Sequence, residues 1–183
     1  MTVEEANRLL AEADVVLSEQ EVTAVIGRMA NDISARLGML QPIVMCVMNG
    51  GLVFAGQLLT KLRFPLEVDY VHATRYGYET TGFELTWLVR PRTELRDRAV
   101  LLLDDIIDEG VTLATIADYC YQEGAKEVVT AVLIDKRHER KLFPELRADF
   151  AGIETGDRFL FGYGLDYKGY WRNAPGIYAV KGL

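Results

Sequence analysis

The stretch VLLLDDIIDEGVTL, which runs from Val100 to Leu113, decides the fold. It opens with an unbroken run of apolar residues and closes that run on two adjacent carboxylates, Asp104 and Asp105. A segment that is apolar at every position is typical of a strand buried on both faces of a parallel sheet. We therefore predict a central parallel strand whose carboxyl end carries both acids.

The rest of the chain alternates helical and strand patterns around this stretch. Residues 3–37 carry apolar side chains at helical spacing and are predicted to be helical. Two more helices are predicted, over 52–62 and from about Thr112 to Glu123, where Gly124 ends the second. Strands are predicted at 43–48, 66–74, 83–89, 99–105, 128–135, 148–153, 158–164 and 176–180. This alternation predicts an α/β fold, with a central, mostly parallel sheet flanked by helices.

Length, composition and charge limit the class of protein. The chain has 183 residues, half of them hydrophobic, which fits a single domain. No apolar run approaches the roughly 20 residues that a membrane span needs. The acidic, amphipathic N-terminal segment lacks the features of a signal peptide, so we expect a soluble cytoplasmic protein. The net charge of −7 argues against nucleic acid as a partner.

Several enzyme classes are disfavoured by missing motifs. The two serines, Ser18 and Ser34, do not lie in the G-x-S-x-G turn of serine hydrolases, and no G-x-x-x-x-G-K-[ST] phosphate loop is present. Cys46 and Cys120 lie in apolar surroundings and are expected to be buried free thiols. The two histidines, His72 and His138, have no cysteine or histidine partner at metal-ligand spacing and are interpreted as structural.

The acids at the end of the central strand suggest a ligand. In an open parallel sheet, ligands bind beyond the carboxyl ends of the strands. Because buried carboxylates need cations or hydroxyls nearby, Asp104 and Asp105 suit Mg²⁺ or a sugar diol. The loop that follows opens a helix whose free N–H groups and positive dipole end suit a phosphate, and Thr112 adds a hydroxyl. Together these groups suit a ribose 5-phosphate.

The same stretch carries a family resemblance. VLLLDDIIDEGVTL resembles the phosphoribosyl-pyrophosphate (PRPP) signature of the type I phosphoribosyltransferases, which reads apolar strand, two acids, two apolar residues, acid, Thr or Ser, glycine, any residue, Thr. Downstream, VLIDKR and DRFLFGYGLDYKGYWRN are similar to the purine-binding half of the hypoxanthine-guanine branch. The resemblance extends from about Ile43 onward. It implies one phosphoribosyltransferase domain over 1–183, with a core at about 38–150 and a small purine-binding hood from the N-terminal helical segment and about 151–183.

The resemblance also implies roles for the residues around the signature. Asp104 and Asp105 would hold the ribose hydroxyls, directly or through Mg²⁺. Asp108 would be the general base near purine N7. The segment that cradles the 5-phosphate would comprise Asp108, Glu109, Gly110, Val111 and Thr112.

On the purine side, the resemblance implies that Lys136 donates to the 6-oxygen and that Phe159 stacks on the base. The Leu160 backbone would meet the Watson–Crick edge of the purine. Asp166 would bind a second Mg²⁺, so the implied metal ligands are Asp104, Asp105 and Asp166.

The pyrophosphate would be held by two separate segments. Arg172 would reach it with its side chain, and the Asn49–Gly50 turn with backbone N–H groups. That turn often lies next to a non-proline cis peptide in the family, here Met48–Asn49. A loop from about Arg75 to Phe83, beginning with Arg75 and Tyr76, would close over the site.

Three positions depart from the family pattern. Glu109 stands where Thr or Ser is usual, Asn49 where Lys is common, and Arg75-Tyr76 where the closing loop usually carries Ser-Tyr. These departures concern the rate and the affinity for PRPP more than the class of ligand.

We therefore predict a Mg²⁺-dependent purine-salvage enzyme. It would transfer the phosphoribosyl group from PRPP to hypoxanthine or guanine, giving IMP or GMP and pyrophosphate. The branch implies a homodimer or homotetramer. Two alternatives stay open, namely a regulatory protein that kept the PRPP pocket but lost catalysis, and a transferase that prefers xanthine.

Overall fold

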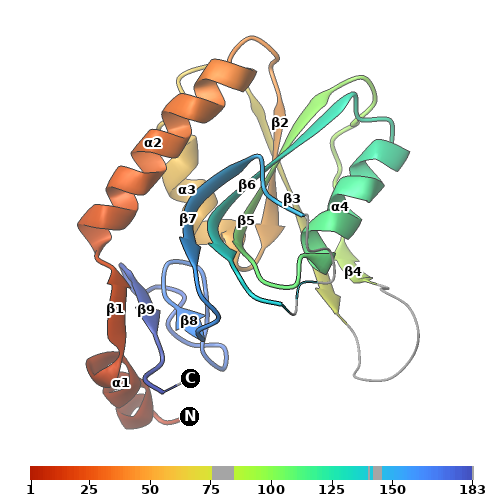
Figure 1. Ribbon diagram of the computed structural model, residues 1–183. Coiled ribbons are helices and arrows are strands. Elements are labelled where there is room, and N and C mark those ends of the chain that lie inside the picture. The colour runs from red at the N-terminus through yellow and green to blue at the C-terminus, as the bar shows by residue number, and fades with distance from the viewer. Residues whose placement is uncertain (76–84, 140, 142–145, 183) are drawn as a thin grey trace.

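The computed structural model describes residues 1–75, 85–139, 141 and 146–182, which form two β-sheets with helices packed around them (Figure 1). The helices are α1 (Val3–Glu12), α2 (Glu19–Leu37), α3 (Gly51–Leu59) and α4 (Val111–Gln122). The strands are β1 (Asp14–Leu17), β2 (Ile43–Met48), β3 (Glu67–Arg75), β4 (Leu85–Val89), β5 (Ala99–Ile107), β6 (Glu127–Lys136), β7 (Phe150–Thr155), β8 (Leu160–Phe161) and β9 (Ile177–Ala179).

The larger sheet has six strands in the order β4-β3-β2-β5-β6-β7. All neighbouring pairs are parallel except β3 and β4, which are antiparallel. Helices α2 and α3 pack on one face, and α4 packs on the other (Figure 1). The predicted mostly parallel sheet with flanking helices is therefore confirmed.

The apolar run of β5 is buried because both faces of the sheet are covered. Leu101 and Leu103 pack with α2 and α3, whereas Val100 and Leu102 pack with α4. All four of these side chains are fully buried. The strand therefore ends its apolar run inside the molecule, and its carboxyl end delivers Asp104 and then Asp105 to the edge of the core.

The smaller sheet corrects the prediction of one continuous helix over 3–37. Residues 14–17 form β1, which pairs antiparallel with β9, and β9 pairs in turn with β8. Val15 and Val16 are β-branched, which favours a strand over a helix. Ser18 then starts α2 with a capping box, in which it accepts from the Glu21 N–H at 3.4 Å and donates its own N–H to the Glu21 carboxylate at 2.8 Å. The helical pattern is thus two helices joined by a strand.

The predicted strand at 158–164 is also shorter than expected. Only Leu160 and Phe161 are in β8, because Gly162, Tyr163 and Gly164 have φ values of 93°, 52° and 109°. Three successive left-handed residues turn the chain back on itself instead of extending it. The turn carries the following segment toward the carboxyl ends of β2 and β5, where Gly164 packs on Gly50.

The division into a core at about 38–150 and a hood stays a prediction, and the boundary between the two sheets does not follow its bounds. Strand β7 belongs to the larger sheet and extends to Thr155, and α2 packs on that sheet as well. The smaller sheet takes its strands from both ends of the sequence, and the Trp171 indole N–H donates to the Ala6 carbonyl of α1 at 2.7 Å. The smaller sheet is therefore associated with α1, β1 and the residues after β7.

The two cysteines are buried, as expected from their apolar surroundings in the sequence. Cys46 and Cys120 are buried free thiols, and burial raises the pKa of both to about 12. Both thiols therefore stay protonated near neutral pH and act as small apolar side chains.

No helix among the described residues has the length and hydrophobicity needed to cross a membrane.

Candidate active site

A cavity of about 360 Å³ opens at the carboxyl ends of β2, β5 and β6. Segments that lie far apart in the sequence meet there, as predicted for an open parallel sheet. The predicted site residues that line it are Asn49, Gly50, Asp104, Asp105, Asp108, Thr112, Lys136, Phe159, Leu160, Asp166 and Arg172. The structure therefore brings most of the predicted site into a single cavity.

The remaining predicted residues lie beside this cavity or outside the described part of the chain. Gly110 lines a smaller adjoining cavity of about 180 Å³ together with Thr112. Val111 is buried at the start of α4, and the half-buried Glu109 lines neither cavity. Arg75 is the last residue of β3, and Tyr76 lies outside the described residues.

The loop after β5 becomes a helix at Gly110. This residue is the N-cap of α4 and has a φ of 86°, a conformation that favours glycine. A Cβ atom at this position would lie 2.6 Å from the Leu146 side chain. The glycine therefore lets the chain turn tightly between Asp108 and α4, so that the first N–H groups of the helix begin directly beside the cavity.

The turn after β2 packs against the central strand. The Met48–Asn49 peptide is cis, as the resemblance implies. A Cβ atom on Gly50 would lie 2.1 Å from the Asp105 carboxylate, and one on Gly164 would lie 2.2 Å from the Gly50 carbonyl oxygen. A larger residue at either position would separate the turn from Asp105. Two glycines thus keep the backbone of three segments in contact at the floor of the site.

Asp104 and Asp105 are a buried carboxylate pair, each only 8% exposed. The Asp105 N–H donates to Asp104 Oδ1 at 2.9 Å. Burial, and then the neighbouring Asp105 charge, raise the pKa of Asp104 well above its usual value. Burial also raises the pKa of Asp105, although the Asp104 hydrogen bond and the charge of Arg172 act in the opposite direction. The pair is therefore a place where a cation or sugar hydroxyls would relieve an electrostatic cost.

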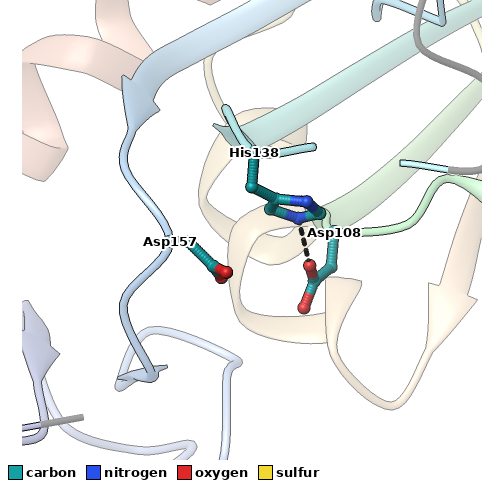
Figure 2. A group of neighbouring side chains, drawn as sticks. All are labelled: Asp108, His138 and Asp157. Atoms are coloured by element: carbon teal, nitrogen blue, oxygen red, sulfur yellow. Dashed lines mark hydrogen bonds and ion pairs between the residues drawn. The ribbon is translucent and has the colours of Figure 1, made fainter. Parts of the chain in front are cut away.

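Four charged or ionisable side chains meet at the other side of the cavity. The Lys136 ammonium at the end of β6 lies 3.3 Å from Asp108 Oδ2 and 3.7 Å from Asp157 Oδ1. His138 Nε2 lies 2.6 Å from Asp108 Oδ1. Figure 2 shows His138, Asp108 and Asp157 converging from three separate segments of the chain. Lys136 is buried, so its charge is directed at these carboxylates and at the cavity.

The segment after β8 supplies the third side of the cavity. The Arg172 guanidinium forms an ion pair with Asp166 and donates to the Gly164 carbonyl at 2.6 Å. Asp166 also accepts the Gly169 N–H at 2.7 Å, which fixes its carboxylate in a turn. Phe159 is 43% exposed and makes an edge-to-face contact with Tyr167, with the ring centroids 5.3 Å apart. An apolar ring is thus left accessible at the mouth of the cavity.

The sequence of this site matches a known family. A family model described as the phosphoribosyl transferase domain matches residues 12–168. The chain belongs to the phosphoribosyltransferase family. The matched residues include β5, the acids Asp104, Asp105 and Asp108, and the segment that runs from Phe159 to Lys168. Most of the residues that line the cavity described above therefore lie within the match.

Several members of the phosphoribosyltransferase family are similar over nearly the whole chain. The hypoxanthine-guanine phosphoribosyltransferase of Aquifex aeolicus is 31% identical, covering 91% of this chain and 94% of the relative. The Bacillus subtilis protein of the same name is 30% identical, covering 91% and 92%. A solved hypoxanthine-guanine-xanthine phosphoribosyltransferase superposes with a TM-score of 0.83 at 26% identity, covering 92% of this chain and 96% of the other.

Two groups in this phosphoribosyltransferase offer ligand atoms for a metal ion. Asp104 and Asp105 are buried acids without an ion-pair partner among the described residues. Asp108, His138 and Asp157 form the second group, with ligand atoms within 4.8 Å of one another. The Lys136 ammonium already lies beside both carboxylates of the second group. A divalent cation therefore fits the Asp104–Asp105 pair better, since neither of these acids forms an ion pair among the described residues, although the charge of Arg172 acts on Asp105.

Two residues of this site were missed at the level of sequence. Asp157 was not singled out, and His138 was interpreted as structural although it contacts Asp108. A signal for His138 did exist, because it lies two residues after Lys136 at the end of a strand. Side chains two residues apart on an extended segment project to the same side. Applied just beyond β6, this rule would have placed His138 beside the predicted base.

Proposed function

We propose that this chain is a purine-salvage enzyme that transfers the 5-phosphoribosyl group from PRPP to hypoxanthine or guanine, with IMP or GMP and pyrophosphate as products. One observation carries the proposal. The buried Asp104–Asp105 pair and the Lys136–Asp108 ion pair face the same cavity, one on each side. A ribose with its phosphates and a 6-oxopurine need these two kinds of group at neighbouring positions.

The acidic strand end and the start of α4 would bind the phosphoribosyl group. Asp104 and Asp105 would accept from the ribose hydroxyls or hold Mg²⁺, with Asp166 at a second metal position. Bound Mg²⁺ supplies positive charge that neutralises the leaving pyrophosphate. The backbone N–H groups from Glu109 to Thr112 would bind the 5-phosphate, because they stand at the N-terminus of α4. Asn49, Gly50 and Arg172 would face the pyrophosphate.

The opposite side would recognise and deprotonate the base. Lys136 would donate to the 6-oxygen, and the accessible ring of Phe159 would stack on the purine beside the Leu160 backbone. Asp108 would accept the purine proton as the bond to C1′ forms, which is general-base catalysis. Adenine would be rejected, because its 6-amino group and the Lys136 ammonium are both hydrogen-bond donors and cannot bond to each other.

Steady-state kinetics with PRPP, Mg²⁺ and each of hypoxanthine, guanine, xanthine and adenine test this function. We expect turnover with hypoxanthine and guanine and little with adenine. A preference for xanthine would support the alternative base specificity. Binding of PRPP or GMP without turnover of any base would support the regulatory alternative and overturn the proposed reaction.

Replacement of Lys136 by alanine tests the base side. We expect KM for hypoxanthine and guanine to rise by about 10- to 100-fold, as is usual for losing a hydrogen bond from a charged group. Discrimination against adenine should weaken, whereas KM for PRPP should change little. Lys126→Ala is a matched control, because Lys126 is exposed next to the opposite end of β6. If only the PRPP affinity falls, Lys136 belongs to the other half of the site.

Replacement of Glu109 by threonine tests how the phosphate is bound. A carboxylate about 4 Å from a phosphate charge would cost on the order of 4 kcal/mol at an effective dielectric constant near 20. Glu109 lines neither cavity, so we predict that its side chain points away from the phosphate and that backbone N–H groups bind it. Glu109→Thr should then change KM for PRPP by less than about tenfold. A larger gain in affinity would show that the carboxylate intrudes.

We also propose that the chain works in the cytoplasm as a homodimer or homotetramer, without a nucleic-acid or membrane partner. Exposed apolar side chains on β3 and β4, Val68, Tyr70 and Leu88, support an interface between copies. The acidic net charge speaks against nucleic acid. Sedimentation velocity at assay concentrations tests the assembly, and the mass of a single chain would contradict it.

A further inference from the structure

His138 lies against the proposed general base, on a segment that the reaction chemistry described so far does not use. Its side chain is only 4% exposed, and its Nε2 atom is 2.6 Å from Asp108 Oδ1. The other carboxylate oxygen, Oδ2, is 3.3 Å from the Lys136 ammonium. The two oxygens of Asp108 therefore face different partners, one imidazole and one ammonium. Figure 2 shows the contact with the imidazole.

The segment that carries His138 is held by a buried carboxylate. Asp135, near the end of β6, is 1% exposed. Its Oδ1 atom accepts from the buried Lys141 ammonium at 2.5 Å, and its Oδ2 atom lies 3.3 Å from the Arg137 guanidinium. Arg137 and Lys141 stand on either side of His138 in the sequence. Asp135 thus fixes the chain before and after His138, which sets where the imidazole can lie.

The chemistry of the pair determines the direction of the hydrogen bond. A carboxylate that acts as a base must be ionised, and an ionised carboxylate only accepts hydrogen bonds. At 2.6 Å, His138 Nε2 must then carry the proton and donate it to Asp108 Oδ1. This bond restrains rotation of the carboxylate, while Oδ2 stays beside Lys136, where the purine would bind.

We propose that His138 is a positioning residue for the general base. It orients Asp108 through Oδ1 so that Oδ2 is directed at the purine proton, and it does not itself contact the base or PRPP. The inference rests on the proposed function. It concerns the rate of the chemical step and not the affinity for either substrate, because the imidazole acts only through Asp108.

Kinetics of paired variants test the positioning role. His138→Leu removes the donor, and we expect kcat to fall by about tenfold or more while KM for PRPP stays within about twofold. His138→Gln keeps an N–H donor at the end of the side chain and should recover most of the rate. In an Asp108→Asn background, His138→Leu should lower kcat by less than about twofold, because the base it orients is already lost. Equal losses in the leucine and glutamine variants, or full additivity with Asp108→Asn, would overturn the proposal.

A spectroscopic measurement tests the contact without relying on turnover. The chain has only two histidines, so ¹⁵N-resolved spectra of the imidazole groups can be assigned by the loss of one set of signals in His138→Gln. We expect His138 to carry its proton on Nε2 in the native chain, and this preference to be lost in Asp108→Ala. A proton on Nδ1 alone, or spectra unaffected by Asp108→Ala, would contradict the inference. If the native chain fails to turn over any purine, the proposed function fails, yet this measurement still decides whether His138 donates to Asp108. Melting temperatures of the variants separate a loss of orientation from a loss of fold.

Discussion

Replacing Asp108 by asparagine is expected to lower kcat by roughly 100-fold or more while leaving GMP binding largely intact. The amide has nearly the shape of the carboxylate but cannot take a proton from the purine nitrogen. In the structure, Asp108 lies between Lys136 and His138 at the edge of the cavity, within reach of a base placed against Lys136. The measurement is kcat at saturating PRPP and hypoxanthine, with GMP affinity determined by calorimetry.

The matched control for this variant is Asp118→Asn, which makes the same chemical change at an exposed position of α4. It should leave kcat unchanged. An unchanged kcat in Asp108→Asn would remove Asp108 from the catalytic role. A loss of GMP affinity as large as the loss of kcat would show that Asp108 binds the ligand and does not act in the chemical step.

Removal of divalent cations is expected to abolish turnover. Without Mg²⁺, the charges of PRPP would meet the Asp104–Asp105 pair unscreened, and that pair is buried without an ion-pair partner among the described residues. Burial already raises the pKa of both carboxyls, which shows that their charges are costly in this environment. Adding a trianionic or more highly charged substrate would increase that cost, so the enzyme should fail to bind PRPP productively in excess EDTA.

The experiment is a titration of Mg²⁺ back into the chelated enzyme, with initial rates measured at fixed hypoxanthine. Activity should return as free Mg²⁺ rises, and the PRPP affinity should return with it. The melting temperature in EDTA controls for unfolding. Full activity in excess EDTA would contradict the assignment of Asp104, Asp105 and Asp166 to the metal.

The central strand could be predicted from sequence because one local pattern fixes its environment. An unbroken apolar run needs cover on both faces, and β5 receives it from α2 and α3 on one side and α4 on the other. The acids follow directly in the chain, so their place at the carboxyl edge comes with the strand. Lys136 follows the same logic at the end of β6, which pairs with β5 in parallel.

The N-terminal strand could not be predicted in the same way. The periodicity of residues 3–37 is helical on average, and two β-branched residues, Val15 and Val16, are too short a signal to outweigh it. The extended backbone at Asp14–Leu17 also depends on the pairing of β1 with β9. That partner lies at the other end of the sequence. Local periodicity therefore predicted helix over the whole range and could not reveal an interaction that forms only after the whole chain has folded.

The environment of Asp108 shows a second limit of local reasoning. The signature motif identifies Asp108 itself, but its neighbours His138 and Asp157 come from the segments after β6 and β7. Neither belongs to the motif, and each side chain alone resembles an ordinary surface residue. Their meeting depends on the order of parallel strands, which places the ends of β5, β6 and β7 side by side.

The pairing of β1 with β9 also bears on when the protein becomes active during its synthesis. Residues 14–17 leave the ribosome long before residues 177–179 are translated, on the order of 10 to 30 s earlier at usual rates of elongation. Strand β8, next to Phe159, pairs only with β9 among the described strands. A nascent chain can thus assemble the larger sheet and its acidic edge first, while the small sheet beside the purine side must wait. Ribosome-bound chains should accordingly form the larger sheet before the small sheet beside the purine side.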